Sequence, residues 1–203
     1  MIGDSITDCG RARPEGKYPH LGSGYVNIVN GFIQALHPEK NITITNKGIG
    51  GNTVLHLRER WQEDVYDLKP DWLSIKIGIN DVWRQFDSPH LESYVTPDIF
   101  EENYRYILEG CIKNLDLKGL IILSPFYLMK DKNDKMRIMM DQYGAIVKKL
   151  AAEFNAPFID VQKGYDAMME SIDPVEIAAD RIHPDFPGHA MIAGLFLKEI
   201  GAI

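Results

Sequence analysis

The sequence predicts an α/β fold in which a parallel sheet lies between two layers of helices. Short segments rich in apolar or β-branched residues alternate with longer segments whose apolar residues recur at helical spacing. One short segment, Gly119–Leu123, is continuously apolar, which is typical of a strand covered on both faces. No linker or repeat divides the chain. We therefore expect a three-layer α/β sandwich that forms a single domain over residues 1–203.

The composition and charge of the chain narrow the classes of function. Its 203 residues are 45% hydrophobic, which suits one domain with a substantial core. The formal net charge is -7 and the acidic excess is scattered, which argues against a nucleic-acid or anionic-membrane partner. Cys9 and Cys111 are the only cysteines, too few for a disulfide framework. With no membrane-spanning apolar run and no signal peptide, we expect a cytoplasmic protein.

The first third of the chain alternates strand, loop and helix. Met1-Ile2 reads as the end of a strand, and the segment from Thr7 to Ser23, rich in Gly, Pro and Arg, reads as a long loop. The spacing of apolar residues predicts a helix from Gly24 to Leu36, ended by His37-Pro38. The β-branched run Ile42–Thr45 predicts a strand.

The middle of the chain repeats this alternation. A helix is expected from Val54 to Leu68, with one apolar face made of Val54, Leu57, Trp61, Val65 and Leu68. Pro70 ends it, and Trp72–Ile77 is the next expected strand. We expect the residues Gly78–Asp81 to form the loop at the carboxyl end of that strand.

The last part of the chain supplies the remaining elements. Thr96-Pro97 predicts the N-cap and first residue of a helix whose apolar face continues to Cys111. A further helix is expected over Asp134–Phe154, a strand over Pro157–Asp160, and a last helix over Pro187–Ile200.

Ser5, in Gly3-Asp4-Ser5, is the candidate nucleophile, because other polar motifs in the chain can supply the groups that a nucleophilic serine needs. A serine hydroxyl is a weak nucleophile, so a sequence that uses one must supply a base, a group that orients the base and donors for the oxyanion. Asp180-Arg181-Ile182-His183 offers a carboxylate and an imidazole three residues apart. The loops at Gly48–Asn52 and Gly78–Asp81 each follow a strand, so they should lie at the carboxyl ends of the strands, where ligands bind in parallel sheets.

In this order, these four motifs resemble the four blocks of the SGNH (GDSL) hydrolases. Further stretches resemble the bacterial acetylxylan esterases within that family, over nearly the whole chain: Thr7–Arg11, Asn52–Val54, Asp81–Gln85, Ser124–Tyr127 and Met140–Gly144. The resemblance implies a flavodoxin-like sheet. It also implies a serine esterase that removes O-acetyl groups from xylo-oligosaccharides or related carbohydrates through an acetyl-enzyme, without a cofactor or metal.

The resemblance also implies a role for each block. Ser5 would be the nucleophile, His183 the general base, and Asp180 the carboxylate that orients the imidazole. The oxyanion would be bound by the backbone N–H groups of Ser5 and Gly51 and by the side-chain amide of Asn80. Gly51 is preferred because the family's donor is the glycine just before the polar residue, although Gly50 remains an alternative.

Several of these residues have a plainer interpretation. Gly-Asp-Ser alone is more often a turn than a nucleophile. Asn80 could cap its own loop, and Asp81 is expected to hold backbone N–H groups. Asp185 is an alternative orienting carboxylate. His189, in the first turn of the last helix, is expected to pack or cap.

Residues that would contact a sugar are expected in the loops. A sugar ring needs polar partners for its hydroxyls and an aromatic face for its C–H groups. We expect Trp83, Arg84 and Tyr127 to bind substrate, and Trp83 is the first choice because it lies three residues after Asn80. Other loop candidates are Arg11, Arg13, Tyr18 and Phe126.

The resemblance departs from the family at the N-terminus. Only Met1-Ile2 precede Gly3, so the first strand, normally central in the sheet, is expected to be truncated. We hypothesise that the natural protein starts upstream, and such an extension could carry a signal sequence.

Two other functions remain open at this point. A thioesterase or lysophospholipase of the same fold would use the same catalytic residues on longer acyl chains. A non-catalytic carbohydrate-binding protein would keep the pocket without hydrolysis. The resemblance also makes a homo-oligomer reasonable.

Overall fold

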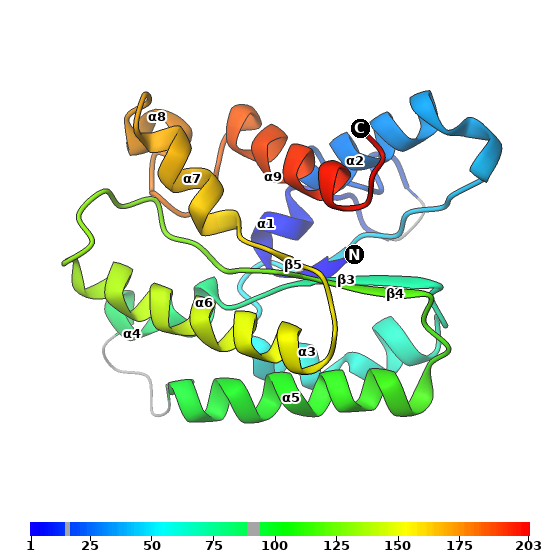
Figure 1. Cartoon of the computed structure of the whole chain (residues 1–203), viewed down its shortest axis with the longest axis horizontal. Coiled ribbons are helices and arrows are strands. Elements are labelled where there is room, and N and C mark those ends of the chain that lie inside the picture. Colours follow the sequence, from blue (N-terminus) through cyan, green and yellow to red (C-terminus); the bar gives the residue numbers. More distant parts are fainter. Residues whose placement is uncertain (15–16, 89–93) are drawn as a thin grey trace.

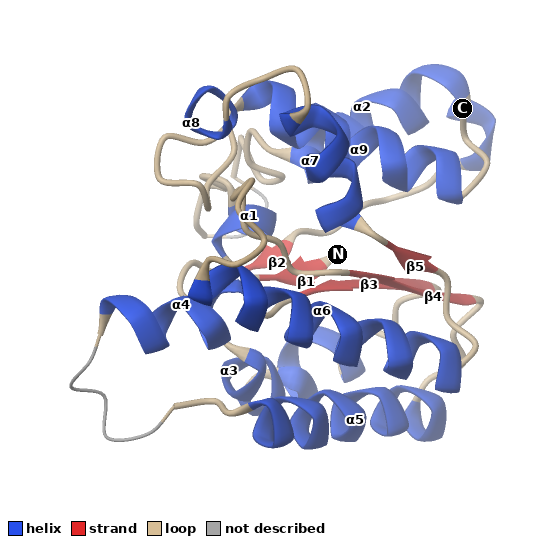
Figure 2. Ribbon diagram, turned by 60° about the vertical axis from the view of Figure 1, so that its left-hand side comes forward, coloured by secondary structure: helices blue, strands red, loops and turns tan. Residues whose placement is uncertain are grey.

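The computed structural model describes residues 1–14, 17–88 and 94–203. A parallel sheet lies between two layers of helices, as Figures 1 and 2 show. This confirms the expected three-layer α/β architecture. The strands are β1 (Ile2–Gly3), β2 (Lys47–Gly48), β3 (Trp72–Lys76), β4 (Gly119–Leu123) and β5 (Phe158–Ile159).

The helices divide between the two faces of the sheet (Figures 1 and 2). One face carries α1 (Ser5–Asp8), α2 (Tyr25–Leu36), α7 (Val161–Met169), α8 (Pro174–Ile177) and α9 (Phe186–Glu199). The other face carries α3 (Val54–Glu59), α4 (Ile79–Asp87), α5 (Pro97–Asn114) and α6 (Lys135–Glu153). A 3₁₀ turn, Pro38–Lys40, follows α2, and a π-helical turn, Gln62–Tyr66, follows α3.

The strand order in the sheet is β2-β1-β3-β4-β5, and every pairing is parallel. This is the expected flavodoxin-like order. The chain places β2 on one side of β1 and then returns to add β3, β4 and β5 on the other side, so the order of the strands reverses between β1 and β3. Such a reversal opens a crevice at the carboxyl ends of the two strands, and ligands bind there in this class of fold.

The short first strand occupies this central position. Ile2 pairs with Lys47 on one side and with Ile75 on the other, and Gly3 pairs with Gly48 and Lys76. Because β1 has two residues, it pairs with only the last two residues of β3. The chain then turns directly into α1, so the register of β1 fixes the position of Ser5.

Several predicted elements are confirmed within a residue or two. The Thr96 side chain accepts a hydrogen bond from the N–H of Ile99 and caps α5, with Pro97 as the first helical residue. Asp134 caps α6 in the same way through the N–H of Arg137. The predicted strand at Gly119–Leu123 is β4, and its last three residues are buried.

The predicted strand at Ile42–Thr45 is wrong. The strand of this region is β2, two residues further on, because only there does the chain lie beside β1. The first hydrogen bonds between the two segments run from the N-terminal ammonium of Met1 to the carbonyl of Thr45 and from the N–H of Lys47 to the carbonyl of Met1, so the segments meet only at the end of residues 42–45. Residues 42–45 have strand-like side chains but no strand beside them among the described residues, so local propensity did not decide the structure.

Two predictions in the middle of the chain also need correction. The long helix starting at Val54 breaks at Arg60 into α3 and the π-helical turn, and Leu68, expected on the buried face, is exposed. The expected loop Gly78–Asp81 is the start of α4. Gly78 has φ +131°, which lets the chain turn from β3 straight into a helix, so Asn80 lies in the first turn of α4.

The sequence did not predict α1, α7 and α8. Each is short and begins at an aspartate whose side chain accepts a hydrogen bond from an N–H of the first turn: Asp4, Asp160 and Asp173. The loop expected from Thr7 to Ser23 therefore begins two residues later than predicted, since α1 extends to Asp8.

None of the helices in the described part of the chain combines the length and the apolarity needed to cross a bilayer.

Candidate functional site

Ser5 lies at the carboxyl end of β1 and is the first residue of α1. Asp4 fixes the turn between strand and helix, because its Oδ1 accepts a hydrogen bond of 2.9 Å from the N–H of Ile6. The side chain of Asp4 is fully buried, whereas Ser5 is half-buried. The fold thus anchors the backbone beside Ser5 and leaves the residue partly accessible at the carboxyl end of β1.

His183 contacts Ser5, although the two residues lie near opposite ends of the sequence. Ser5 Oγ lies 2.8 Å from His183 Nε2, and His183 Nδ1 lies 2.6 Å from Asp180 Oδ2. A carboxylate only accepts, so the proton of the second bond belongs to Nδ1. In that tautomer Nε2 carries a lone pair, which faces the Ser5 hydroxyl and can take its proton.

Asp180 also organises the loop that carries His183. Its Oδ1 accepts hydrogen bonds from the backbone N–H groups of Ile182, at 2.9 Å, and of His183, at 2.8 Å. Partial burial alone would raise the pKa of Asp180, but the hydrogen bonds from the backbone and ring of His183 and from Ile182 hold that pKa below its ordinary value. The carboxylate is therefore ionised, as orientation of the imidazole requires.

The glycine loop after β2 lies against Ser5. A Cβ added at Gly50 would stand 3.9 Å from the Cβ of Ser5. The N–H of Gly50 donates to Asp8 Oδ2 at 3.3 Å, whereas no described residue accepts from the N–H of Gly51. Gly51 has φ +80°, a conformation that favours glycine. Of the two glycines, Gly51 therefore has the N–H that is free to bind a substrate oxygen.

Asn80 is placed beside this loop. Its Nδ2 donates to the carbonyl of Asn52 at 3.0 Å, which uses one of its two protons and orients the amide. Asn52 is in turn held by Arg60, whose Nε donates to Asn52 Oδ1 at 2.7 Å. The other proton of the Asn80 amide is available to a ligand.

Asp81, the next residue, is buried and holds backbone, as expected. Its Oδ1 accepts from the N–H of Val54 at 2.9 Å and so fixes the start of α3, while its Oδ2 has no hydrogen-bond partner among the described residues. Burial raises the pKa of Asp81 to about 7, against the effect of the Val54 N–H, and the nearby charge of Asp4 adds to the rise.

This raised pKa predicts that Asp81 lowers the stability of the protein as pH rises. The unfolded chain releases this proton near the ordinary value of 3.8, and the folded chain releases it near 7. Between those values the folded state binds more protons, so the free energy of unfolding falls as pH rises and levels off above about 7. Between pH 5 and pH 8 the loss is on the order of 2–3 kcal/mol.

Asp81→Asn keeps the acceptor for Val54 and removes the titration. Urea unfolding at pH 5 and at pH 8 should therefore show the variant gaining stability relative to the parent at the higher pH. Asp98→Asn, at an exposed position of α5, is the matched control and should show no such change. An equal difference from the parent at both pH values would contradict the prediction.

Of the three expected sugar-binding residues, Trp83 and Arg84 stack on each other on α4, whereas Tyr127 lies in the segment after β4. The ring of Trp83 stands edge-on to the ring of His183, with 5.9 Å between centroids, and the guanidinium of Arg84 lies 4.5 Å over the Trp83 ring. Tyr127 is half-buried, and its N–H donates to Gln162 Oε1. Trp83 therefore borders the Ser5–His183 pair directly.

Two loop candidates for substrate contact are wrong. Phe126 is fully buried and its ring faces Lys76 Nζ at 4.7 Å, so it belongs to the core. Arg11 is buried and its Nε donates to the carbonyl of Gly48 at 3.0 Å. Tyr18 is 87% exposed and half of the Arg13 side chain is exposed, so both remain available to a partner.

Sequence reasoning missed the role of Asp8. Its Oδ2 accepts hydrogen bonds from Gly50 and from Arg13 Nη2, at 3.3 and 2.8 Å, so it holds the glycine loop close to Ser5. The only signal was its place in a stretch that resembles the acetylxylan esterases. His189 was interpreted correctly as a packing residue: burial lowers its pKa to about 4, helped by the charges of Lys76 and His183, and its Nδ1 accepts from the N–H of Tyr25.

The model of the GDSL-like lipase/acylhydrolase family matches residues 1–191, which is nearly the whole chain. The chain belongs to this family. Among family relatives, the acetylxylan esterase of Geobacillus stearothermophilus is 50% identical over 205 residues, which covers 99% of this chain and 92% of the relative.

Solved structures agree with this assignment. The structure of Axe2, an acetylxylan esterase from Geobacillus stearothermophilus, matches with a TM-score of 0.94 and 49% identity, over 98% of this chain and 92% of Axe2. LAE5, an α/β hydrolase enzyme from the metagenome of Lake Arreo in Spain, matches with a TM-score of 0.95 and 40% identity, over 99% and 93% of the two chains.

Catalytic mutants of Axe2 have also been solved. They replace a serine, an aspartate or a histidine by alanine, and that aspartate and histidine are three residues apart in Axe2. Asp180 and His183 have the same spacing here.

Proposed function

We propose that this protein is a serine esterase that removes O-acetyl groups from xylo-oligosaccharides or related carbohydrates, acting as one domain over residues 1–203. The observation that carries the proposal is the pair of hydrogen bonds from Ser5 Oγ to His183 Nε2, at 2.8 Å, and from His183 Nδ1 to Asp180 Oδ2, at 2.6 Å. The relative at 50% identity, an acetylxylan esterase, supports the substrate class. The catalytic mutants of Axe2 support the roles of the three residues.

The mechanism is acyl transfer through Ser5. His183 Nε2 takes the hydroxyl proton as Ser5 Oγ attacks the carbonyl carbon of the acetyl group. Asp180 holds the ring in the tautomer that accepts this proton and stabilises the imidazolium that forms. When the tetrahedral intermediate collapses, the C–O bond to the sugar breaks and His183 returns the proton to the leaving alcohol oxygen.

Water then completes the cycle. His183 takes a proton from a water molecule as that water attacks the acetyl-Ser5 carbonyl, and acetate leaves as Ser5 recovers its proton. In both steps negative charge develops on the carbonyl oxygen. We assign its stabilisation to the N–H groups of Ser5 and Gly51 and to the Asn80 amide, because the last two groups each have a proton with no acceptor among the described residues.

We assign substrate contact to Trp83, Arg84 and Tyr127. Trp83 packs against His183 and offers an apolar surface beside the nucleophile. Arg84 stacks on that ring and pairs with Asp87, so its position is fixed although part of it is exposed. An aromatic surface with a charged group beside it suits a sugar ring with its hydroxyls.

The test is the release of acetate from acetylated xylo-oligosaccharides, with 4-nitrophenyl acetate and 4-nitrophenyl octanoate compared at equal concentration. We expect acetate release from the sugar and faster cleavage of the acetyl ester. Faster cleavage of the octanoyl ester would indicate a thioesterase or lysophospholipase. Binding of the oligosaccharide with no hydrolysis would indicate a carbohydrate-binding protein.

We also propose a cytoplasmic location and a homo-oligomeric state. Cys9 and Cys111 are both free thiols, as expected in a reducing compartment, and the oligomer follows from the resemblance to the acetylxylan esterases. Fractionation of the native host and sedimentation analysis of the purified protein test the two proposals separately.

A further inference from the structure

We propose that Arg137 is a positioning residue: it fixes the segment Tyr127–Met129, which holds the backbone of Arg181 in the loop between Asp180 and His183. The inference rests on the proposed function, since it concerns the geometry of the Ser5–His183–Asp180 group.

Arg181 has a backbone conformation that must be held in place. Its φ is +63°, in the left-handed region that disfavours a residue with a side chain. On one side the loop is held locally, since the N–H of Arg181 donates to the carbonyl of Ala178 at 2.9 Å. On the other side the carbonyl of Arg181 accepts from the N–H of Leu128 at 3.1 Å. The segment after β4 therefore braces the loop that carries His183.

Both neighbours of Leu128 are anchored in turn. The N–H of Tyr127 donates to Gln162 Oε1 at 2.8 Å, and the carbonyl of Met129 accepts from Arg137 Nη1 at 2.8 Å. Leu128 itself is fully buried. These anchors fix the direction of the Leu128 N–H, which points to the carbonyl of Arg181.

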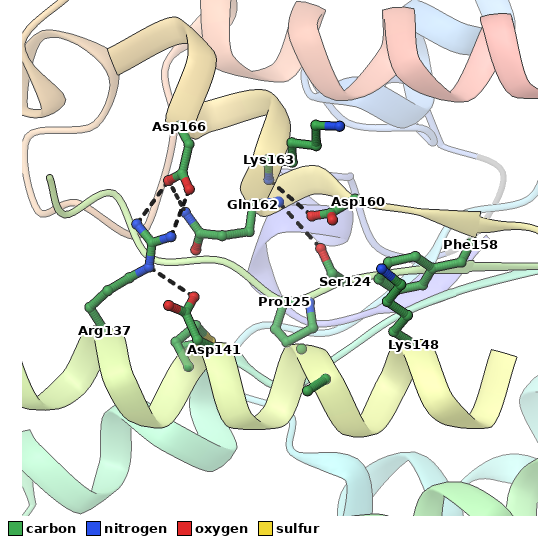
Figure 3. A pocket seen from close by; sticks show the side chains of 13 residues that line it. Ser124, Pro125, Arg137, Asp141, Lys148, Phe158, Asp160, Gln162, Lys163 and Asp166 are labelled. Carbon is green, nitrogen blue, oxygen red and sulfur yellow. Dashed lines mark hydrogen bonds and ion pairs between the residues drawn. The ribbon is translucent and has the colours of Figure 1, made fainter. Parts of the chain in front are cut away.

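Arg137, in the first turn of α6, is the centre of this arrangement (Figure 3). Its side chain is only 3% exposed. The guanidinium donates to both carboxylate oxygens of Asp166, each at 2.8 Å, and its Nε donates to Asp141 Oδ1 at 2.9 Å. Asp166 also accepts from Gln162 Nε2 at 2.9 Å, so the anchors of Tyr127 and Met129 meet at one carboxylate.

The chemistry of this cluster requires arginine. A planar guanidinium can bind one carboxylate with two parallel hydrogen bonds and still donate to a second carboxylate and a carbonyl. An ammonium group has three protons without this geometry. The cluster forms part of the wall of a cavity of about 300 Å³ between α6 and α7, which neither Ser5 nor His183 lines. Arg137 therefore acts on the Ser5 site through backbone contacts.

Loss of the guanidinium should release the carbonyl of Met129, weaken the hydrogen bond from Leu128 to Arg181, and let Arg181 relax out of the left-handed region. His183 would then move relative to Ser5 Oγ. We expect Arg137→Gln to lower kcat by about 10- to 100-fold. The KM should change less than kcat, because Trp83 and Arg84 lie on α4 and the N–H of Tyr127 keeps its acceptor, Gln162 Oε1.

The test is a double-mutant cycle with Arg181→Gly, assayed on 4-nitrophenyl acetate. Glycine accepts a positive φ without strain, so a loop with Gly at 181 should depend less on the brace. The loss of kcat caused by Arg137→Gln should shrink by about tenfold when measured in the Arg181→Gly background. Arg105→Gln is the matched control, because Arg105 also pairs with two carboxylates, of Glu101 and Glu153, and should leave kcat unchanged.

A second readout is independent of hydrolysis. The proton between His183 Nδ1 and Asp180 gives a downfield NMR resonance, which should broaden or disappear in Arg137→Gln and return in the double variant. An unchanged resonance in Arg137→Gln, or an equal loss of kcat in both backgrounds, would overturn the role of Arg137. A parent chain that shows the resonance but hydrolyses no ester would instead overturn the proposed function.

Discussion

Ser5→Ala should lower kcat for acetyl ester hydrolysis by roughly a millionfold, the scale expected when the nucleophile of a coupled catalytic group is removed. The reason is specific to one atom: in the described structure, Ser5 Oγ makes its hydrogen bond with His183 Nε2, and this bond holds no other part of the fold. The melting temperature and the circular dichroism spectrum should therefore match those of the parent.

Ser23→Ala is the matched control for Ser5→Ala. Ser23 is exposed, and its Oγ donates to the carbonyl of Cys9 at 3.1 Å, so its loss removes a comparable hydroxyl. We expect kcat of this variant to stay near that of the parent. If Ser5→Ala kept measurable burst kinetics with 4-nitrophenyl acetate, a nucleophile other than Ser5 would be required.

The sequence predicted the parts of the fold that local periodicity determines. Continuous apolar strands such as Gly119–Leu123 and long amphipathic helices such as α6 carry their signal within one segment. The position of β2 could not be predicted in this way, because Lys47 and Gly48 become a strand only by lying beside Ile2 and Gly3. Pairing with a distant segment thus overrides local propensity, here at one edge of the sheet.

The candidate site shows the same division. The three-residue spacing of Asp180 and His183 places their hydrogen bond within one turn, so it could be predicted locally. That Ser5 meets His183 follows from the order of the strands and from the resemblance to a family. The roles of Asp8 and Arg137 could not be inferred, because each depends on contacts with backbone groups far away in the sequence.

For some individual residues, burial or secondary structure differs from what the sequence indicated. Phe126 and Arg11 lie in loops, as expected, yet both are buried and so are not available at the surface for substrate contact. Asn80 was expected in a loop and lies in the first turn of α4, where the helix gives its amide a fixed direction. A helical position is better suited to an oxyanion donor, because preorganised donors need no rearrangement during the reaction.

Asp180→Asn should lower kcat by about 10⁴-fold without unfolding the loop. Asparagine keeps an oxygen in place of Oδ1, so the N–H groups of Ile182 and His183 retain their acceptor. It places an NH₂ group where Oδ2 stood, and an NH₂ group can only donate. His183 Nδ1 must then accept, the ring proton moves to Nε2, and Nε2 can no longer take the proton of Ser5.

This prediction distinguishes the effect of Asp180 on the tautomer of His183 from its effect on the structure of the loop. Nitrogen NMR of the labelled histidine should show the proton on Nε2 in Asp180→Asn and on Nδ1 in the parent, while the melting temperature changes little. Asp185→Asn is the control, since Asp185 lies two residues after His183, is exposed and caps α9 without a side-chain hydrogen bond. A comparable loss of kcat in Asp185→Asn, with Asp180→Asn active, would make Asp185 the orienting carboxylate. A loss confined to Asp180→Asn with the tautomer reversed would identify the Asp180 carboxylate as the group that makes His183 a base.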